Sequence, residues 1–338
     1  MSGQAKPSKV SASVDFARAG RQVGYLSAPH SRDGSGWGAA RFPIAVFKNG
    51  TGPTLFLTGG NHGDEYEGQI ALVKLIQGLD PQRIQGRVIV MPFLNFPAAV
   101  AGTRLSPIDG VNMNRAFPGD RDGTVTRMIA DFIYRHILPL TDAVADLHSG
   151  GKSMYFSPFG AIHALDETAQ MRRAEAALHA FDPPIALVLR ELDAEGMLDS
   201  AVEGLGKVFV TTELGGGGTT SAATIAVAER GVRNLLIHFG LFEGKPQTRA
   251  GLGLPPMRRM TMPDDAYVVA DDAGLLEMLV DIDGRVASGQ PIAHIYRTDR
   301  PGDAPAVYRA GADGVLIGRA HLCRVEPGDF LAMVAREA

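Results

Sequence analysis

Residues 54–92 read TLFLTGGNHGDEYEGQIALVKLIQGLDPQRIQGRVIVMP and predict the fold class of this chain. An apolar segment at 54–58 runs straight into a glycine-rich turn, and from about Glu65 the apolar side chains recur at helical spacing. A second apolar segment, 87–92, follows Gly86. Strand, helix and strand in this order predict a βαβ unit whose strands are buried on both faces of a sheet.

The same alternation extends in both directions from this unit. An apolar segment at 42–48 precedes it and predicts a strand. Further apolar strands separated by helices predict an α/β fold with a mixed sheet flanked by helices, and such sheets carry their functional residues in loops at the carboxyl edge. The expected helices cover 127–138, 167–181 and 221–241, and the expected strands cover 142–147 and 207–212.

The pattern changes near residue 250, where two prolines precede short alternating segments interrupted by glycines. This predicts an α/β catalytic domain over 1–250, with β segments over 1–50, and a small all-β domain over 251–338. The segment LVDIDGRVASGQPIAHI resembles the hairpin repeat of biotinyl and lipoyl carrier domains. However, the last lysine is Lys245, so no amine beyond it could carry a cofactor, and a structural or gating role is expected.

Composition excludes several classes of protein. Lys and Arg total 33 against 37 Asp and Glu in 338 residues, with a net charge of −4 and no basic run, which argues against nucleic acid or a membrane surface as the partner. A small molecule is expected instead. The single cysteine, Cys323, excludes an internal disulfide and favours a reducing compartment. The amino terminus has no apolar core of a signal peptide, which predicts a cytoplasmic protein.

A candidate metal site begins at His62-Gly63-Asp64-Glu65, an H-x-x-E at a strand-to-helix turn. Side chains three residues apart across a first helical turn project to one side, although a capping carboxylate in a glycine-rich turn is the plainer interpretation. His148 ends a buried strand and supplies a third ligand. Two histidines and a carboxylate, with two ligands close together in the sequence and the third far from them, are typical of catalytic zinc. Asp146 shares the face of His148 and is either its orienting acceptor or an ordinary strand-end acid.

Glu213 is the candidate general base, because it ends a strand beside a four-glycine loop and would reach water at the same sheet edge. An ordinary loop acid is the alternative. The loop 101–119 carries Arg104 and Arg115 with Asn112 and Asn114, a set suited to a carboxylate or developing oxyanion unless the arginines merely hold the loop. The other histidines are expected to be structural, with His30 and His163 in loops left open. No serine-hydrolase elbow, P-loop or H-E-x-x-H motif occurs.

Four motifs together, GGNHGDEYEG, GTR…NMNRAFPG, DLHSGG and TTELGGGG, resemble the succinylglutamate desuccinylase/aspartoacylase family, relatives of the zinc carboxypeptidases. The resemblance covers nearly the whole chain and implies a zinc-carboxypeptidase-like fold with one Zn²⁺ per chain. It implies His62, Glu65 and His148 as zinc ligands and Glu213 as general base. Arg104 would polarise the scissile carbonyl, and Asn114 and Arg115 would hold the α-carboxylate. Asn112, in the same polar loop, is a further candidate for substrate binding.

Within the family, the segments HSRDGSGWG, SPIDGVNMNRAFPG and KVFVTTELGGGG are most similar to the ectoine-utilisation branch, the Nα-acetyl-L-2,4-diaminobutyrate deacetylases. That substrate carries a γ-ammonium group, for which Glu191 and Asp193 are the expected acidic partners.

The resemblance therefore implies a zinc amidohydrolase of N-acyl amino acids with a small-molecule substrate. A cytoplasmic location and a homo-oligomeric state are further expectations. Three alternatives stay open at this point. They are a deacylase of succinylglutamate or N-acetylaspartate type, a small metallocarboxypeptidase, and a metal-stabilised binding protein without catalysis.

Overall fold

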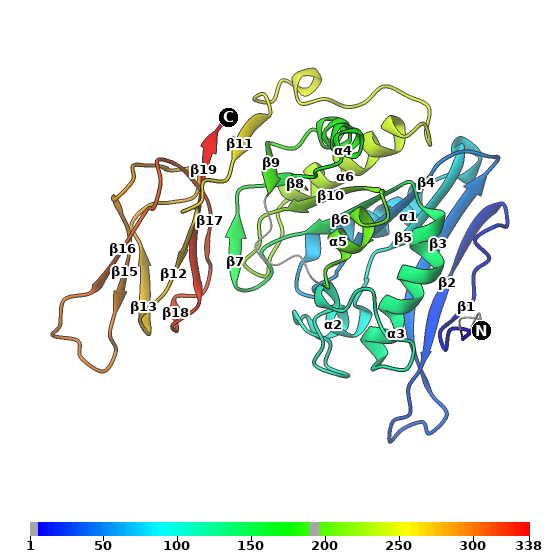
Figure 1. Cartoon of the computed structure of the whole chain (residues 1–338), viewed down its shortest axis with the longest axis horizontal. Helices are drawn as coiled ribbons and strands as arrows, with labels where there is room; N and C mark the ends of the chain where they lie inside the picture. Colours follow the sequence, from blue (N-terminus) through cyan, green and yellow to red (C-terminus); the bar gives the residue numbers. More distant parts are fainter. Residues whose placement is uncertain (1–5, 190–195) are drawn as a thin grey trace.

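The computed structural model describes residues 6–189 and 196–338 and contains a large mixed sheet and a smaller antiparallel one. The large sheet runs across the molecule in the order β1-β2-β3-β5-β4-β6-β10-β8-β9-β11-β19-β17-β14. The amino-terminal strands lie at one end and the carboxy-terminal strands at the other (Figure 1). This confirms the expected α/β class with an all-β carboxy-terminal part.

The elements have the following bounds. The helices are α1 (Tyr66–Gly78), α2 (Phe96–Ala101), α3 (Val125–Phe132), α4 (Thr168–Phe181), α5 (Leu198–Glu203) and α6 (Ala222–His238). The first ten strands are β1 (Ser11–Ala12), β2 (Gly20–Pro29), β3 (Ala39–Asn49), β4 (Thr54–Gly59), β5 (Gly86–Met91), β6 (Ala143–His148), β7 (Met154–Phe156), β8 (Phe159–His163), β9 (Ile185–Leu189) and β10 (Val208–Glu213). The later strands are β11 (Arg258–Thr261), β12 (Tyr267–Val269), β13 (Gly274–Met278), β14 (Arg285–Val286), β15 (Pro291–Tyr296), β16 (Ala306–Arg309), β17 (Gly314–Ala320), β18 (Arg324–Val325) and β19 (Phe330–Glu337).

The centre of the large sheet is parallel and covered on both faces. β5, β4, β6 and β10 are parallel neighbours, so the loops after β4, β6 and β10 meet at one edge. Leu55 and Leu57 of β4 pack in one core with α1, α4 and α6, while Phe56 between them packs in another core with α3 and α5. Because both faces of β4 are covered, all of its residues are buried and its central residues Leu55, Phe56 and Leu57 are apolar.

Two expected helices differ from the observed ones in their ends. The helix expected over 127–138 begins at Val125, becomes a π-helical turn over Ile133–Ile137 and ends in a 3₁₀ turn. The helix expected over 221–241 ends at His238, because Gly240 adopts a left-handed conformation with φ of 71° that stops it. Sequence analysis also missed β8 and β9, which lie in the sheet between β10 and β11.

The strands after residue 250 join both sheets. β11 pairs with β9 and with β19, which makes β19, β17 and β14 a continuation of the large sheet. β12 also pairs with β19, and β16, β15, β13 and β18 form the four-stranded sheet. Within the described residues, no helix is both long and apolar enough to cross a lipid bilayer.

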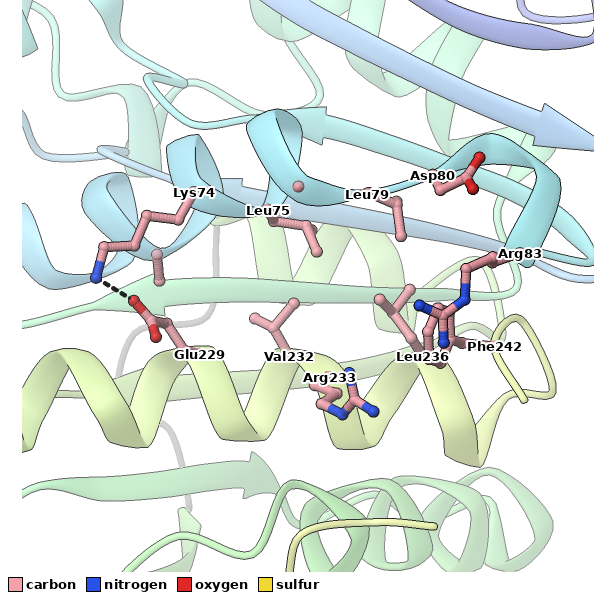
Figure 2. A pocket seen from close by; sticks show the side chains of 12 residues that line it. Lys74, Leu75, Leu79, Asp80, Arg83, Glu229, Val232, Arg233, Leu236 and Phe242 are labelled. Atoms are coloured by element: carbon pink, nitrogen blue, oxygen red, sulfur yellow. Dashed lines mark hydrogen bonds and ion pairs between the residues drawn. The ribbon is translucent and has the colours of Figure 1, made fainter. Parts of the chain in front are cut away.

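A cavity of about 270 Å³ lies between α1 and α6, on the helical layer of the large sheet. Figure 2 shows Lys74 of α1 and Glu229 of α6 paired across it, with Arg83 and Arg233 beside the ring of Phe242. None of the residues expected to carry chemistry lines this cavity. It is therefore a gap between two packed helices. The candidate site residues lie elsewhere, at the edge of the large sheet.

Candidate metal centre and active site

Three buried side chains of ligand type meet where the loops after β4 and β6 converge. His62 lies in the turn after β4, Glu65 begins α1, and His148 ends β6. Their ligand atoms all lie within 4.8 Å of one another. The Nδ1 atom of His62 is 2.6 Å from one carboxylate oxygen of Glu65, and the Nδ1 atom of His148 is 2.7 Å from the other. This cluster could hold a metal ion.

The capping interpretation of Glu65 is wrong. Glu65 occupies the N-cap position of α1, but its side chain makes no capping hydrogen bond. Both of its oxygens instead contact the two histidines, and one also accepts a hydrogen bond from the backbone N–H of Ser149 at 3.2 Å. The carboxylate therefore faces the metal cluster and not the helix end.

The second nitrogen of each histidine has its own acceptor. Nε2 of His62 is 3.2 Å from Oδ1 of Asn112, and Nε2 of His148 is 2.9 Å from Oδ2 of Asp146. In the neutral imidazole, an acceptor at Nε2 holds the proton there, so the Nδ1 lone pair is the one available to a metal. Asn61 also donates to Asp146, at 2.8 Å. These contacts prepare both imidazoles to bind a cation through Nδ1.

The electrostatics of the cluster favour a cation. Burial alone raises the pKa of Glu65, but the neighbouring His62 and His148 outweigh it and hold that pKa well below its usual range. Burial alone lowers the pKa of His148, but Asp146 and Glu65 outweigh it and hold that pKa well above its usual range. The carboxylates that retain a proton on His148 would equally attract a metal ion when that proton leaves.

Tight backbone packing holds the H-x-x-E turn in place. A Cβ atom on Gly63 would come within 2.0 Å of the carbonyl carbon of Ala98, so no larger residue fits there. The carboxylate of Asp64 accepts the backbone N–H of Lys152 at 2.9 Å and ties the turn to the loop after β6. The two loops that carry the ligands are therefore joined directly.

Glu213 lies at the same edge, in register with His148 across the parallel strands β10 and β6. One of its carboxylate oxygens is buried and has no hydrogen-bond partner among the described residues. Burial, reinforced by the negative charge of Glu65, raises its pKa to about 8. The glycine loop that follows is packed closely, since a Cβ on Gly216 would lie 2.2 Å from the carbonyl oxygen of Met154. A carboxyl group with this pKa is suited to exchanging protons near neutral pH.

The loop 101–119 brings its polar side chains to the cluster. Nη1 of Arg104 lies 3.3 Å from Nδ1 of His62 and 3.6 Å from a carboxylate oxygen of Glu65. Arg115 donates to the backbone carbonyl of Asn114 at 3.1 Å, and both side chains line the same pocket as Glu213. Their predicted contacts with substrate stay predictions, but the structure brings all three residues to one place.

Asn112 occupies a different position from its neighbours. Its Oδ1 atom accepts the backbone N–H of Asn114 at 3.0 Å and contacts Nε2 of His62, and its side chain is not among those that line the pocket. These contacts favour a role in orienting His62 and in capping the 3₁₀ turn Met113–Arg115. Direct substrate binding by Asn112 stays a prediction.

The pocket in front of the cluster has a volume of about 320 Å³. Its polar residues come from the turn after β4, the loop 101–119, α5 and the ends of β6, β8 and β10, and part of its apolar lining comes from β12 and β19. A pocket of this size fits a small ligand. The apolar lining residues are Met154, Phe156, Phe159, Leu189, Met197, Tyr267, Phe330 and Met333.

Sequence analysis missed several polar residues of the site. Asn61 donates to Asn114 at 3.1 Å as well as to Asp146, and so connects a predicted substrate anchor with a partner of His148. Its place directly before His62 was the available signal. His163 was expected in a loop, but it ends β8, lines the pocket and contacts the carboxylate of Glu203 at 3.0 Å. Asp199 also lines the pocket.

Two predicted residues cannot be placed. Glu191 and Asp193, the acids expected to bind a substrate ammonium group, lie outside the described residues.

Glu67 is a buried acid that sequence analysis also missed, and it provides a test by pH. Burial raises its pKa to about 7 from an ordinary 4.5, although Ser149 and Thr224 oppose the shift. The folded state then holds the proton more tightly than the unfolded state, so stability falls as pH rises from 4.5 to about 7. Glu67→Gln should remove this loss, which is on the order of 3 kcal/mol. Urea unfolding of both proteins at pH 5 and pH 8 measures it, and an equal difference at both pH values would contradict the prediction.

Comparisons with known proteins agree with this architecture. Residues 51–239 match the model of the succinylglutamate desuccinylase/aspartoacylase catalytic domain. An N-alpha-acetyl-L-2,4-diaminobutyric acid deacetylase of Halomonas elongata is 49% identical over 334 residues, covering 98% of this chain and 96% of the relative. A product-bound structure of the ectoine utilization protein EutE (DoeB) from Ruegeria pomeroyi is 45% identical with a TM-score of 0.94, covering 98% of this chain and all of the other. A succinylglutamate desuccinylase/aspartoacylase from Rhodobacter sphaeroides is 41% identical with a TM-score of 0.93, covering 98% of this chain and 99% of the other.

Proposed function

The chain belongs to the succinylglutamate desuccinylase/aspartoacylase family, and from this premise we propose that it is a zinc-dependent deacylase that hydrolyses Nα-acetyl-L-2,4-diaminobutyrate to acetate and 2,4-diaminobutyrate. The observation that carries the proposal is the meeting of a buried His62, Glu65 and His148 cluster with Glu213 in one small pocket. The similarity to the Halomonas deacetylase over nearly the full length of both chains supports the substrate.

The donor set fits a zinc ion. Two imidazole nitrogens and one carboxylate, each held in place by further hydrogen bonds, are the ligands that catalytic zinc commonly uses. When bound, zinc would polarise a carbonyl oxygen and lower the pKa of water towards about 7. His62, Glu65 and His148 would hold it.

Glu213 would move the proton of the reaction. Its carboxylate takes a proton from water as the water oxygen adds to the acyl carbon, and it returns that proton to the α-nitrogen as the amide C–N bond breaks. Acetate and the free α-amine result. A raised pKa allows the same carboxyl group to accept and then donate the proton near neutral pH.

Arg104 would stabilise the negative charge that develops on the acyl oxygen. Its guanidinium lies beside the cluster, and about two fifths of its side chain is exposed, so it extends from the loop into the open part of the pocket. A fixed positive charge near an oxyanion lowers the barrier because it needs no rearrangement during the reaction.

Asn114 and Arg115 would hold the α-carboxylate of the substrate. Oδ1 of Asn114 already accepts from Asn61 at 3.1 Å and from the backbone N–H of Leu198 at 3.3 Å. These two donors fix the orientation of the amide, so its Nδ2 is the atom that remains to donate to a ligand. Arg115, directly beside it, adds a permanent charge suited to a carboxylate.

A peptidase function is less well supported. Tyr267, Phe330 and Met333 from the carboxy-terminal strands form part of the pocket wall, which leaves little room for a chain beyond one amino acid. We propose that residues 1–250 form the catalytic domain and that the all-β domain, residues 251–338, limits substrate length in this way. A binding protein without catalysis would have no need of a buried, proton-exchanging Glu213 opposite His148.

Hydrolysis of a matched panel of substrates tests the function. We expect kcat/KM for acetate release from Nα-acetyl-diaminobutyrate to exceed that for the Nγ isomer, N-acetylaspartate, N-succinylglutamate and a C-terminal dipeptide by at least about tenfold, the effect of ~1.4 kcal/mol. Preference for an acidic side chain would overturn the diaminobutyrate assignment and leave a deacylase. Faster cleavage of the dipeptide would overturn the deacylase as well.

A further inference from the structure

The proposed substrate has a group for which the site described so far offers no partner. Its acyl carbonyl would face Arg104 and its α-carboxylate would face Asn114 and Arg115, but the proposed roles give its γ-ammonium group no partner. A cation that enters a half-enclosed pocket loses hydration and needs a carboxylate or other acceptors in return. The inference below rests on the proposed function and deepens it.

Three carboxylates among the described residues line the pocket: Glu65, Glu213 and Asp199. Glu65 contacts both histidines of the metal cluster with its two oxygens. Glu213 is assigned to proton transfer. Asp199 is the remaining carboxylate of this set, and nothing in the reaction uses it.

Asp199 follows directly on a residue that contacts the predicted α-carboxylate anchor. Asp199 is the second residue of α5, and the residue before it, Leu198, donates its backbone N–H to Oδ1 of Asn114. Asp199 is therefore the residue directly after the contact between α5 and Asn114, the predicted α-carboxylate anchor. In diaminobutyrate only two methylene groups separate the α-carbon from the γ-nitrogen, so the two charged ends of the substrate require partners that lie close together.

Asp199 is buried at the wall of the pocket, where a carboxylate can contact a bound cation directly. Asp199 is only 5% exposed and lines the pocket, so it faces the interior of the site and not bulk solvent. Met197 and Leu189 line the same pocket and would contact the methylene groups. A carboxylate in such a setting interacts more strongly with a cation than one in water does.

We propose that Asp199 is the specificity-determining residue of this site and accepts hydrogen bonds from the γ-ammonium group of the substrate. Asp199 thereby selects N-acyl amino acids with a short cationic side chain over neutral ones of the same shape.

A pair of isosteric substrates tests this assignment. Nα-Acetylnorvaline carries a methyl group where Nα-acetyl-diaminobutyrate carries its ammonium group. We expect wild-type kcat/KM to favour the cationic substrate, and Asp199→Asn to reduce this ratio roughly 10- to 100-fold, as expected for loss of a hydrogen bond to a charged group. The change should appear mainly in KM for the cationic substrate, while turnover of the norvaline substrate persists.

Two further variants keep the test decisive. Ser200→Ala removes the Oγ hydrogen bond to the carbonyl of Met197 at the start of α5 but no charge, and it should leave the ratio unchanged. Asp199→Ser serves if thermal melting shows that the asparagine variant does not fold. A wild-type ratio near one would overturn the diaminobutyrate function and this inference together. A wild-type preference that survives loss of Asp199 would overturn this inference alone and would direct attention to Glu191 and Asp193.

Discussion

Replacement of Glu213 by glutamine is expected to lower kcat by roughly 10²- to 10⁴-fold, the usual contribution of a general base. Glutamine keeps the shape of the side chain but cannot accept the proton of water. Because, among the described residues, no side-chain hydrogen bond or ion pair joins Glu213 to His62, Glu65 or His148, metal binding should be retained. KM should change little, since the substrate anchors lie on Arg115 and its neighbours.

Measurement of kcat and metal content on the same preparation separates catalysis from folding. Glu229→Gln is a suitable control, because it also removes one carboxylate but lies on α6 at the cavity shown in Figure 2. This control should retain wild-type turnover. A Glu213→Gln protein that binds metal and has a kcat within a few fold of the wild-type value would overturn the assignment of Glu213 as general base. The alternative of a binding protein without catalysis would then have to be considered again.

Removal of the metal is the second change expected to have a very large effect. Chelation should reduce hydrolysis to background and lower the melting temperature, because an ion that binds only the folded state stabilises it by mass action. Restoring one equivalent of Zn²⁺ per chain should recover both. Activity that survives in chelated protein shown to be free of metal would contradict the prediction.

Metal binding should also release protons, and this follows from the pKa of His148. Asp146 and Glu65 raise that pKa, so the metal-free protein holds a proton on His148 near neutral pH that a metal must displace. Metal affinity should therefore fall as pH falls. Calorimetric titrations in buffers of different ionisation enthalpy measure the protons released. His163→Asn, which removes another buried histidine of the pocket, should still bind one metal per chain, whereas His148→Asn should not.

Much of the fold was predictable because its signals are local. β4 has an apolar centre, Leu55 to Leu57, and a glycine-rich turn and helical periodicity follow it, so the βαβ unit over 54–92 needed no knowledge of distant residues. β8 and β9 were missed because their short segments lie between turns and carry no period of their own. The early end of α6 depended on the left-handed conformation of Gly240, which the helical pattern on its own does not reveal.

The candidate site divides in the same way. The proximity of His62 and Glu65 follows from their spacing of three residues, and the carboxyl ends of apolar strands marked His148 and Glu213. Their meeting depends on β4, β6 and β10 being neighbours, since this order brings the turn after β4 and the ends of β6 and β10 to one pocket. The roles of Asn61 and Asn112 depend on the groups that their side-chain amides contact, Asn114 and His62 respectively. No local sequence pattern predicts these contacts.

The sequence alone therefore determined the α/β class and the family resemblance, and it predicted His62, Glu65, His148 and Glu213 as candidate site residues. Periodicity, short spacings and strand ends are properties of neighbouring residues, so they can be read locally. Only the tertiary structure decided that Glu213 lies in register with His148 and that the carboxy-terminal strands β12 and β19 form part of the pocket wall. It also decided that Asp199 follows Leu198, the residue whose backbone contacts Asn114. These relations join residues far apart in the chain. They arise from strand order and side-chain packing, where the burial of apolar surface by the whole molecule selects one arrangement.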